Sequence, residues 1–272
     1  MSRKQGAAYT LGFSALVCLV CSVFVSFSNV SLKERQELNR QVDKQKNVLV
    51  AAGLATSDEK LSSEEIVARF QSIVPVAVAL RDPNQPKDEE RKPGSGAVLS
   101  DVDASAIDML AAMQDENASL REPANKAGIL RVPYVGVVYQ VMEGDRVARL
   151  VLPISGKGLW STMYGFMAIA ADTTTIKGVS FYDHGETAGL GGEIENPSWT
   201  ARWHDRRLFD DAWQPIFAVR KGAAGSVTED PHGVDGLSGA TLTSNGVTES
   251  VRFWVGEYGY GPYLKAFREG GR

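Results

Sequence analysis

The chain has 272 residues, of which 43% are hydrophobic and 23% are charged, and its 29 basic and 33 acidic residues give a formal net charge of −4. This composition excludes a disordered or collagen-like chain, and the presence of one long apolar run excludes a transporter with many spans. The weakly acidic balance disfavours nucleic-acid binding. Both cysteines, Cys18 and Cys21, lie in the apolar run, so we expect no disulfide framework, cysteine nucleophile or zinc–thiolate site in the remainder.

The apolar run extends from Tyr9 to Val30 without a charged residue. A helix needs about 20 residues to cross the hydrocarbon core, so we expect an N-terminal segment, 1–30, with a transmembrane helix over about 9–30. A cleaved signal peptide is the alternative, but its apolar region is usually only about 7–15 residues long. The orientation stays open at this point, because Arg3 and Lys4 precede the span and several basic residues follow it.

Residues 31–94 are predicted to form a juxtamembrane helical region and a linker. The polar stretch 31–50 continues the helix out of the membrane, and residues 81–94 are rich in proline and charge, as exposed connections are. Ser62 and Glu65 have the spacing of a capping box. The helix that they begin is expected to place four apolar residues on one face: Ile66, Phe70, Ile73 and Val74.

Residues 95–272 are predicted to form an α+β domain of antiparallel strands with packed helices. Alternating apolar residues indicate two hairpins, with strands at 135–141 and 146–154 and at 164–170 and 176–182. The other expected elements are a short helix at 104–113, a helix at 199–208 capped by Asn196 or Ser198, a strand at 216–222, and a last helix with Val247, Val251, Trp254, Val255 and Tyr258 on its apolar face.

Three glycine-bearing turns are the candidates for ligand binding: 156–160, 184–192 and 235–241. Glycine lets backbone N–H groups approach an anion, above all where the chain then enters a helix, as it does after the third turn. None of the turns is a Walker loop or a dinucleotide fingerprint. Turns that bind no ligand remain the alternative.

The third turn carries a more specific pattern, because Asp235, Ser238, Gly239, Ala240 and Thr241 match the flavinylation motif D-x-x-[ST]-G-A-T. On this motif the chain resembles the FMN-binding domains of the C-type subunits of Na⁺-translocating NADH:quinone oxidoreductases (Na⁺-NQR) and of the G-type subunits of Rnf complexes. The segments GKGLW, HGET-x-GLGGEIENP and VRKGA occur in the same order, and the resemblance covers nearly the whole chain. It is closer to the Na⁺-NQR family.

The resemblance implies FMN bound covalently through a phosphoester to the Thr241 hydroxyl, attached by a separate flavin transferase that recognises Asp235 and Ser238. The backbone of Ser238, Gly239 and Ala240 suits the remaining phosphate charge. Further cofactor-binding residues carried over from the family motifs are Glu186, Thr187, Leu190, Trp160 and Lys221. For each of these residues a purely structural role is the alternative, as it is for His184.

No residue of this chain is expected to be catalytic by itself, and no metal site is expected. The rival metal clusters are Asp183, His184 and Glu186, and Asp230, His232 and Asp235, but the chain lacks an HExxH motif and has no cysteine near them. A serine hydrolase is disfavoured because Ser238 and Ser244 lack a G-x-S-x-G setting.

The resemblance therefore implies an electron-transfer subunit with covalent FMN in a six-subunit sodium-pumping complex, subunits A–F, of the bacterial inner membrane. It would relay electrons one at a time between NADH and quinone, with its FMN domain on the periplasmic side, and would be inactive alone. The alternatives are an Rnf-type subunit, a stand-alone extracytoplasmic flavoprotein, and a membrane-anchored binding or scaffold protein without a cofactor.

Overall fold

The computed structural model describes residues 6–85 and 92–270, and the chain separates into two compact units, Met1–Lys44 and Gln45–Arg272. Arg3 and Lys4, which enter the orientation argument, and residues 86–91 of the predicted linker lie outside the described residues. Helix α1 (Ala7–Ala52) begins in the first unit and ends in the second, so the polar helix predicted to continue from the apolar run is confirmed.

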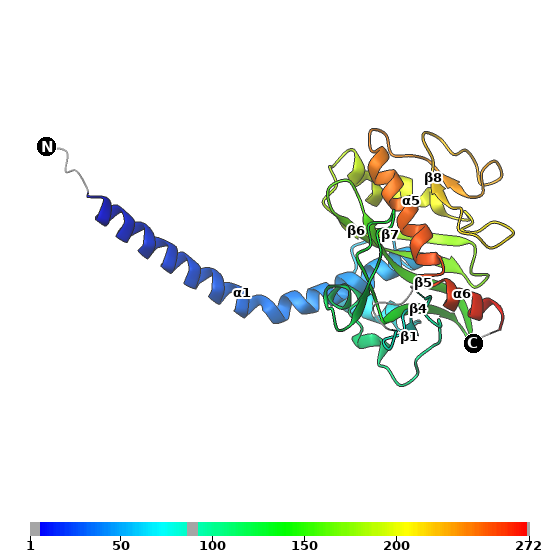
Figure 1. The fold of residues 1–272 in the computed structure, drawn as a ribbon, viewed down its shortest axis with the longest axis horizontal. Coiled ribbons are helices and arrows are strands. Elements are labelled where there is room, and N and C mark those ends of the chain that lie inside the picture. Colours follow the sequence, from blue (N-terminus) through cyan, green and yellow to red (C-terminus); the bar gives the residue numbers. More distant parts are fainter. Residues whose placement is uncertain (1–5, 86–91, 271–272) are drawn as a thin grey trace. The chain divides into compact units, whose positions relative to one another are not determined.

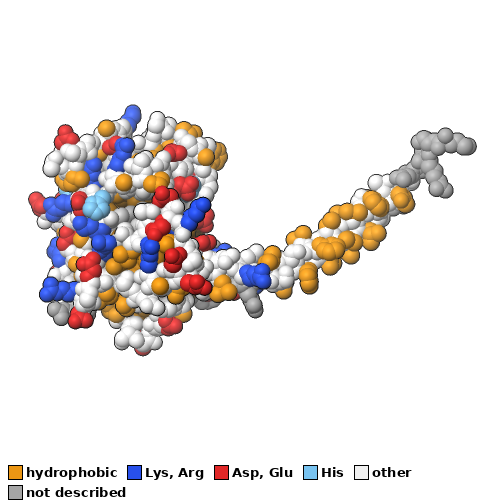
Figure 2. Space-filling model, turned by 180° about the vertical axis from the view of Figure 1, so that it is seen from behind, with side chains coloured by type: hydrophobic (Ala, Val, Ile, Leu, Met, Phe, Trp, Pro, Cys, Tyr) orange, Lys and Arg blue, Asp and Glu red, His pale blue; other side chains and the backbone are white. Residues whose placement is uncertain are grey.

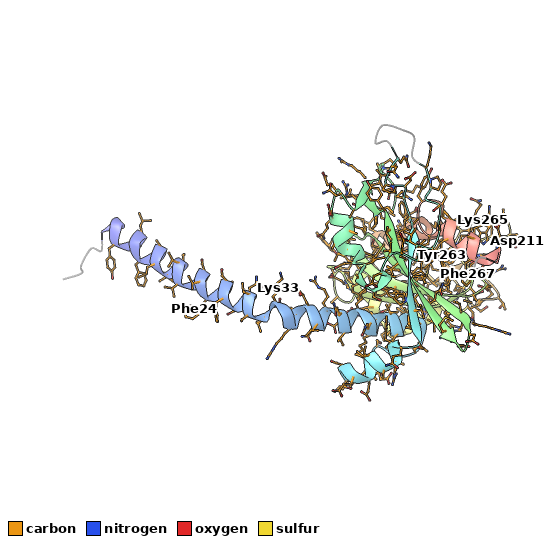
Figure 3. The ribbon with its side chains drawn as sticks, turned by 90° about the horizontal axis from the view of Figure 1, so that it is seen from below. Phe24, Lys33, Asp211, Tyr263, Lys265 and Phe267 are labelled. Carbon is orange, nitrogen blue, oxygen red and sulfur yellow. The ribbon has the colours of Figure 1, made fainter. Side chains whose placement is uncertain are left out.

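The first unit holds a stretch of α1, Tyr9–Lys33, that is long and apolar enough to cross a membrane. None of its most apolar window is buried, and Figure 2 shows apolar side chains along the visible face of this helix. Phe24 projects from the apolar stretch and Lys33 lies at its end (Figure 3). This helix thus has the length and the surface of a membrane anchor.

The second unit is built on a five-stranded sheet in the order β1-β4-β5-β6-β7, in which every neighbouring pair is antiparallel. The strands are β1 (Ile73–Ala79), β4 (Val135–Glu143), β5 (Arg146–Lys157), β6 (Thr162–Ala170) and β7 (Ile176–Asp183). Two smaller sheets pair β2 (Ser119–Arg121) with β3 (Arg131–Pro133), and β8 (Ala218–Val219) with β9 (Gly233–Val234). Both predicted hairpins are confirmed, as is the α+β class.

The sequence of each hairpin turn explains its geometry. Between β4 and β5, Gly144 adopts a positive φ of 62°, which glycine tolerates without strain. Between β6 and β7, the Asp172 carboxylate accepts hydrogen bonds from the backbone N–H groups of Thr174 and Thr175, at 2.8 and 2.9 Å. These bonds close the turn and fix the register of the two strands.

Helices cover both faces of the sheet, as Figure 1 shows for α5, which crosses it. The helices and 3₁₀ turns of the unit are α2 (Ser63–Phe70), η1 (Ala104–Ala106), α3 (Met109–Gln114), η2 (Gly191–Glu195), α4 (Pro197–Thr200), η3 (Ala201–Trp203), α5 (Thr241–Val255) and α6 (Gly261–Arg268). On one face α5 packs on β5, where Trp254 Nε1 donates to the Ser155 carbonyl at 2.8 Å. On the other face Phe70 of α2 contacts Tyr139, and Asn47 near the end of α1 accepts a hydrogen bond from Ser180.

One predicted helix is shorter than expected. The capping box of Ser62 and Glu65 is confirmed, but α2 ends at Phe70, and Ile73 and Val74 belong to β1 instead. Pro75 explains the change, because proline removes a helical hydrogen bond and is tolerated in an edge strand such as β1. Residues from the predicted juxtamembrane region thus supply one strand of the sheet.

Other expected elements are shorter or broken. Residues 104–113 form η1 and α3 rather than one helix, and the helix expected at 199–208 is reduced to α4 and η3. Asn196 is its N-cap, with its side chain accepting from the Ser198 N–H at 2.9 Å. The strand expected at 216–222 is only β8, because the segment then turns toward the 222–236 loop. Helix α5 ends at Val255, so Tyr258 lies beyond its apolar face.

Candidate functional site

The three glycine-bearing turns meet at the beginning of α5. The Glu186 carboxylate, in the glycine-bearing turn 184–192, accepts hydrogen bonds from backbone N–H groups of residues 159–161. It also accepts one from the Thr243 hydroxyl near the N-terminus of α5. A Cβ added to Gly239 in the third turn would lie 3.0 Å from Leu190 Cδ2 in the second. Segments that are distant in sequence therefore form one site beside Thr241.

Glu186 is the centre of this arrangement. Its Oε1 accepts from the N–H groups of Trp160 at 2.9 Å and Ser161 at 3.3 Å, and its Oε2 accepts from the Leu159 N–H at 3.2 Å and the Thr243 hydroxyl at 2.5 Å. Burial by itself disfavours the charged form, but these four hydrogen bonds outweigh it and hold the pKa of Glu186 below its ordinary value. The side chain is thus a buried carboxylate anchored by three consecutive backbone N–H groups.

Close packing around this carboxylate explains two of the glycines. A Cβ on Gly158 would lie 2.5 Å from Glu186 Oε1, and a Cβ on Gly191 would lie 2.6 Å from Thr243 Oγ1. A side chain at Gly158 would collide with the Glu186 carboxylate, and one at Gly191 would collide with Thr243 of α5. Gly158 and Gly191 therefore allow the first two glycine-bearing turns and α5 to pack closely around Glu186.

Thr241 is the first residue of α5, and it is exposed. The preceding turn is closed by a hydrogen bond from the Ala240 N–H to the Leu237 carbonyl at 3.1 Å, with Gly239 at a φ of 70°. No side chain caps this end of the 15-residue helix. An anion beside Thr241 would therefore meet uncapped N–H groups and the positive end of the helix dipole.

The neighbouring hydroxyl groups on α5 differ from that of Thr241. The Thr243 hydroxyl is buried and donates to Glu186, while the Ser244 hydroxyl is buried and accepts from the Leu237 N–H at 3.2 Å. Ser238 is exposed but lies in the turn before the helix. In the first turn of α5, Thr241 is thus the hydroxyl that a reagent from solvent can reach.

Exposed apolar side chains come from the same three segments. Trp160 is 66% exposed and Leu190 is 44% exposed, and Leu242, next to Thr241, is 61% exposed. Thr187 is also exposed, and its carbonyl accepts from the N–H groups of Leu190 and Gly192, which shapes the second turn. A planar aromatic ligand could cover such side chains and remove apolar surface from water.

Asp235, the first residue of the motif, holds its own loop together. Its carboxylate pairs with Arg202 and accepts from the Ala224 N–H at 2.7 Å, and its carbonyl accepts from Trp199 Nε1 at 2.8 Å. Lys221 is exposed, with no ion pair among the described residues. The carbonyl of the next residue, Gly222, accepts from the Gly236 N–H at 2.8 Å, so the structure links the Lys221 segment to the start of the motif.

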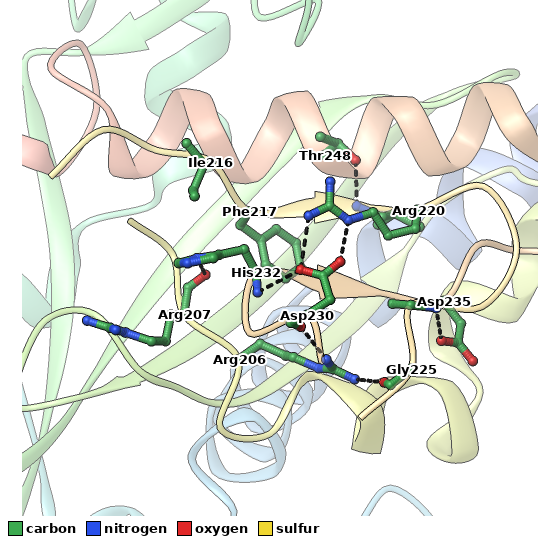
Figure 4. Close-up of polar contacts among 12 residues, drawn as sticks. Arg206, Arg207, Ile216, Phe217, Arg220, Gly225, Asp230, His232, Asp235 and Thr248 are labelled. Atoms are coloured by element: carbon green, nitrogen blue, oxygen red, sulfur yellow. Dashed lines mark hydrogen bonds and ion pairs between the residues drawn. The ribbon is translucent and has the colours of Figure 1, made fainter. Parts of the chain in front are cut away.

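Figure 4 shows the contacts that order the loop between Lys221 and Asp235. Arg220 forms a bidentate pair with Asp230, at 2.6 and 3.0 Å. The buried Arg206 guanidinium donates to the carbonyl groups of Gly225 and Asp230. Above this loop, the Thr248 hydroxyl of α5 accepts from the Val219 N–H at 2.9 Å. The arginine contacts thus hold the loop together, and the bond from Val219 attaches the strand that precedes the loop to α5.

Three carboxylates of the rival metal clusters are already bound within the protein. Glu186 is bound by four donors, Asp230 by Arg220, and Asp235 by Arg202. His184 Nδ1 accepts from the Glu186 N–H at 3.2 Å, and its Nε2 lies 3.6 Å from Glu195. Across residues 6–85 and 92–270, no group of three or more histidine, cysteine or acidic residues has the geometry of a metal site.

Sequence reasoning missed three residues that hold the 235–241 turn and the adjoining Glu186: Thr243, Arg202 and Trp199. Thr243 could have been found, because it follows Thr241 by two residues at the start of a helix whose next turns are apolar. Arg202 and Trp199 carry no local signal, because they reach Asp235 only through the tertiary fold.

Comparison with known proteins gives four relevant matches: one family model, two relatives and one solved structure. Residues 158–256 match the model of the family described as the FMN-binding domain. The C-type subunit of the Na⁺-translocating NADH-quinone reductase from Yersinia pestis is 45% identical over 96% of this chain and 93% of that protein, and the one from Vibrio anguillarum is 41% identical over 99% and 98%. The crystal structure of Shewanella oneidensis NqrC has a TM-score of 0.72 and 31% identity, covering 85% of this chain and all of that one.

Proposed function

The chain belongs to the NqrC family, the C-type subunits of Na⁺-translocating NADH-quinone reductases, and we propose that it carries FMN covalently, as a phosphoester on the Thr241 hydroxyl. The resemblance described from the sequence is thereby confirmed at the level of the family. The observation that carries the proposal is the setting of Thr241. It is an exposed threonine at the uncapped start of a long helix, while the Thr243 and Ser244 hydroxyls are buried and bonded.

The residues around Thr241 fit a phosphorylated flavin. The turn of Ser238, Gly239 and Ala240, with the start of α5, would hold the phosphate through backbone N–H groups. Trp160, Thr187 and Leu190 would line the ring, because they are exposed on the neighbouring turns. Glu186 lies beneath the turn of Trp160, and Lys221 would add positive charge from the adjoining loop. FMN bound here supplies one- and two-electron redox chemistry.

In the complex, the chain would relay electrons one at a time between the cofactors of other subunits. A covalent attachment suits this role, because a carrier that serves two partners must not dissociate between them. The relatives' names support an assembly with further subunits of the reductase. The assembly would contain six subunits in all, and a separate flavin transferase would attach the FMN after recognising Asp235 and Ser238. The isolated chain would show no NADH:quinone turnover.

We propose that α1 anchors the chain once in the bacterial inner membrane and that the FMN domain, residues 95–272 with the preceding 31–94 region, lies on the periplasmic side. The apolar stretch Tyr9–Lys33 supports the anchor. Protease treatment of spheroplasts tests the orientation. Degradation of the domain supports it, and full protection until the membrane is lysed contradicts it.

The attachment is tested with the full chain produced together with a flavin transferase. We expect the wild type to be heavier than the polypeptide by about 0.44 kDa, the mass of one FMN residue, and to fluoresce in a denaturing gel. Thr241→Val should lose both signals. Thr228→Val, at an exposed threonine of the 222–236 loop, is the matched control and should keep them. An adduct that persists in Thr241→Val would overturn the proposal.

A further inference from the structure

We propose that Thr243 and Glu186 are positioning residues for the flavin, which together fix the turn of Trp160 against the first turn of α5. This inference rests on the proposed attachment of FMN to Thr241. It assigns a role to Thr243 and gives Glu186 an indirect role in place of direct contact with the ring.

The first step of the argument is the capacity of the Glu186 carboxylate. A carboxylate has about four acceptor positions. Three are taken by the N–H groups of residues 159–161, and the fourth by the Thr243 hydroxyl. The residue is also buried, with an exposed fraction of only 8%. Glu186 therefore has no acceptor position left for a flavin N–H group and acts on the ring through the residues that it holds.

The second step is the connection that this carboxylate makes. Thr243 lies two residues after Thr241 in the first turn of α5, so its position is fixed relative to the attachment site. Its hydroxyl donates to Glu186 Oε2 at 2.5 Å, and Glu186 Oε1 accepts from the Trp160 N–H at 2.9 Å. Two hydrogen bonds through one buried side chain thus connect the helix that bears Thr241 to the backbone of Trp160.

The third step is that the Trp160 turn has few other attachments near its tip. The Gly158 N–H donates to the Ser161 carbonyl at 2.8 Å, which closes the turn on itself, and Lys157 Nζ donates to the Trp160 carbonyl at 3.3 Å. The Ser161 hydroxyl accepts from the Gly185 N–H at 2.6 Å, which joins the turn to the segment that carries Glu186 but not to α5. The Trp160 side chain is 66% exposed. Its place relative to a ring on Thr241 is therefore set by the backbone of the turn, and Glu186 connects that backbone to α5.

The prediction is tested with Thr243→Val, which removes the hydroxyl and keeps the side-chain shape. Thr243→Ser keeps the donor and should behave as wild type. Thr248→Val is the matched control, because it removes a buried hydroxyl from the same helix, where Thr248 binds Val219 and the Ser244 carbonyl. Should Thr243→Val fail to fold, Thr243→Ala replaces it, because alanine places no methyl group against the carboxylate.

Two readouts separate this inference from the proposed attachment. In full chain made without the transferase, hydrogen exchange of the 159–161 amides should become about tenfold faster in Thr243→Val than in wild type, Thr243→Ser or Thr248→Val. In flavinylated chain, whose adduct is checked by intact mass, the flavin fluorescence yield of Thr243→Val should rise toward that of Trp160→Leu.

Unchanged exchange and unchanged fluorescence in Thr243→Val, with the adduct present, would overturn the positioning role. Faster exchange with wild-type fluorescence would also overturn it, because the turn would then be loosened without consequence for the ring. A missing adduct in wild type would instead refute the attachment to Thr241, while the exchange experiment would still decide whether Thr243 holds the turn.

Discussion

Replacing Glu186 by glutamine tests how strongly the three turns depend on one carboxylate. The glutamine oxygen can accept from two of the four donors, whereas its NH₂ group would face the other two. Each hydrogen bond to a charged group contributes about 1.5–3 kcal/mol, so the loss of two should cost about 3–6 kcal/mol of unfolding free energy. For a unit of this size, about 2–4 °C of melting temperature corresponds to each kcal/mol, which gives a decrease of roughly 6–24 °C.

The assay is thermal unfolding of the full chain followed by circular dichroism. Glu195→Gln is the matched control, because its carboxylate is exposed and lies 3.6 Å from His184, beyond hydrogen-bond distance. We expect Glu195→Gln to change the unfolding free energy by less than about 0.5 kcal/mol relative to wild type. A melting temperature of Glu186→Gln within about 2 °C of wild type would refute the reasoning.

Three further predictions concern the same unit. The folded-state pKa of Glu186 lies below its ordinary value of 4.5, so the stability that its charged form contributes is present above pH 4.5 and is lost as the pH falls through the lowered pKa. In urea unfolding, the difference in unfolding free energy between wild type and Glu186→Gln should be constant from about pH 5 to 8 and shrink only at lower pH. A decrease of that difference already between about pH 7 and 5 would contradict this prediction. Arg81→Met removes the positive partner of Glu122 from an ion pair whose side chains are fully buried, and should lower the unfolding free energy by about 3–5 kcal/mol. The double variant Arg81→Met/Glu122→Leu should recover part of this loss, and equal stability of Arg81→Met and wild type in denaturant titration would contradict the prediction. Asp235→Asn loses an ion pair with the half-exposed Arg202 and should lower the unfolding free energy by less than about 1 kcal/mol. The same variant should carry less FMN, and a complete adduct in its intact mass would contradict recognition of this carboxylate by the transferase.

Much of the sheet was predictable because its signals are local. The alternating apolar residues of both hairpins and the turn residues Gly144 and Asp172 lie within short stretches of sequence. Strand β1 was missed because Ile73 and Val74 also fit the apolar face of the preceding helix. Pro75 in a run of valine and alanine was the available signal against a longer helix.

The site was predictable as a set of turns, but its internal contacts were not. The motif from Asp235 to Thr241 points to Thr241 as the proposed attachment residue. The comparisons confirm the family that the motif indicated. The sequence does not reveal that Glu186 binds backbone N–H groups 25 to 27 residues earlier in the chain, or Thr243 further along it. Such contacts depend on how the turns pack together, which no local pattern encodes.

The most direct test of the account is tandem mass spectrometry of the proteolytic peptide that contains residues 238–245, taken from the full chain in a membrane of a host that attaches flavins. We predict one FMN adduct located on Thr241, with Ser238, Thr243 and Ser244 unmodified. An adduct on any of those three residues, or an unmodified peptide from a host shown to flavinylate other proteins, would contradict the assignment of Thr241.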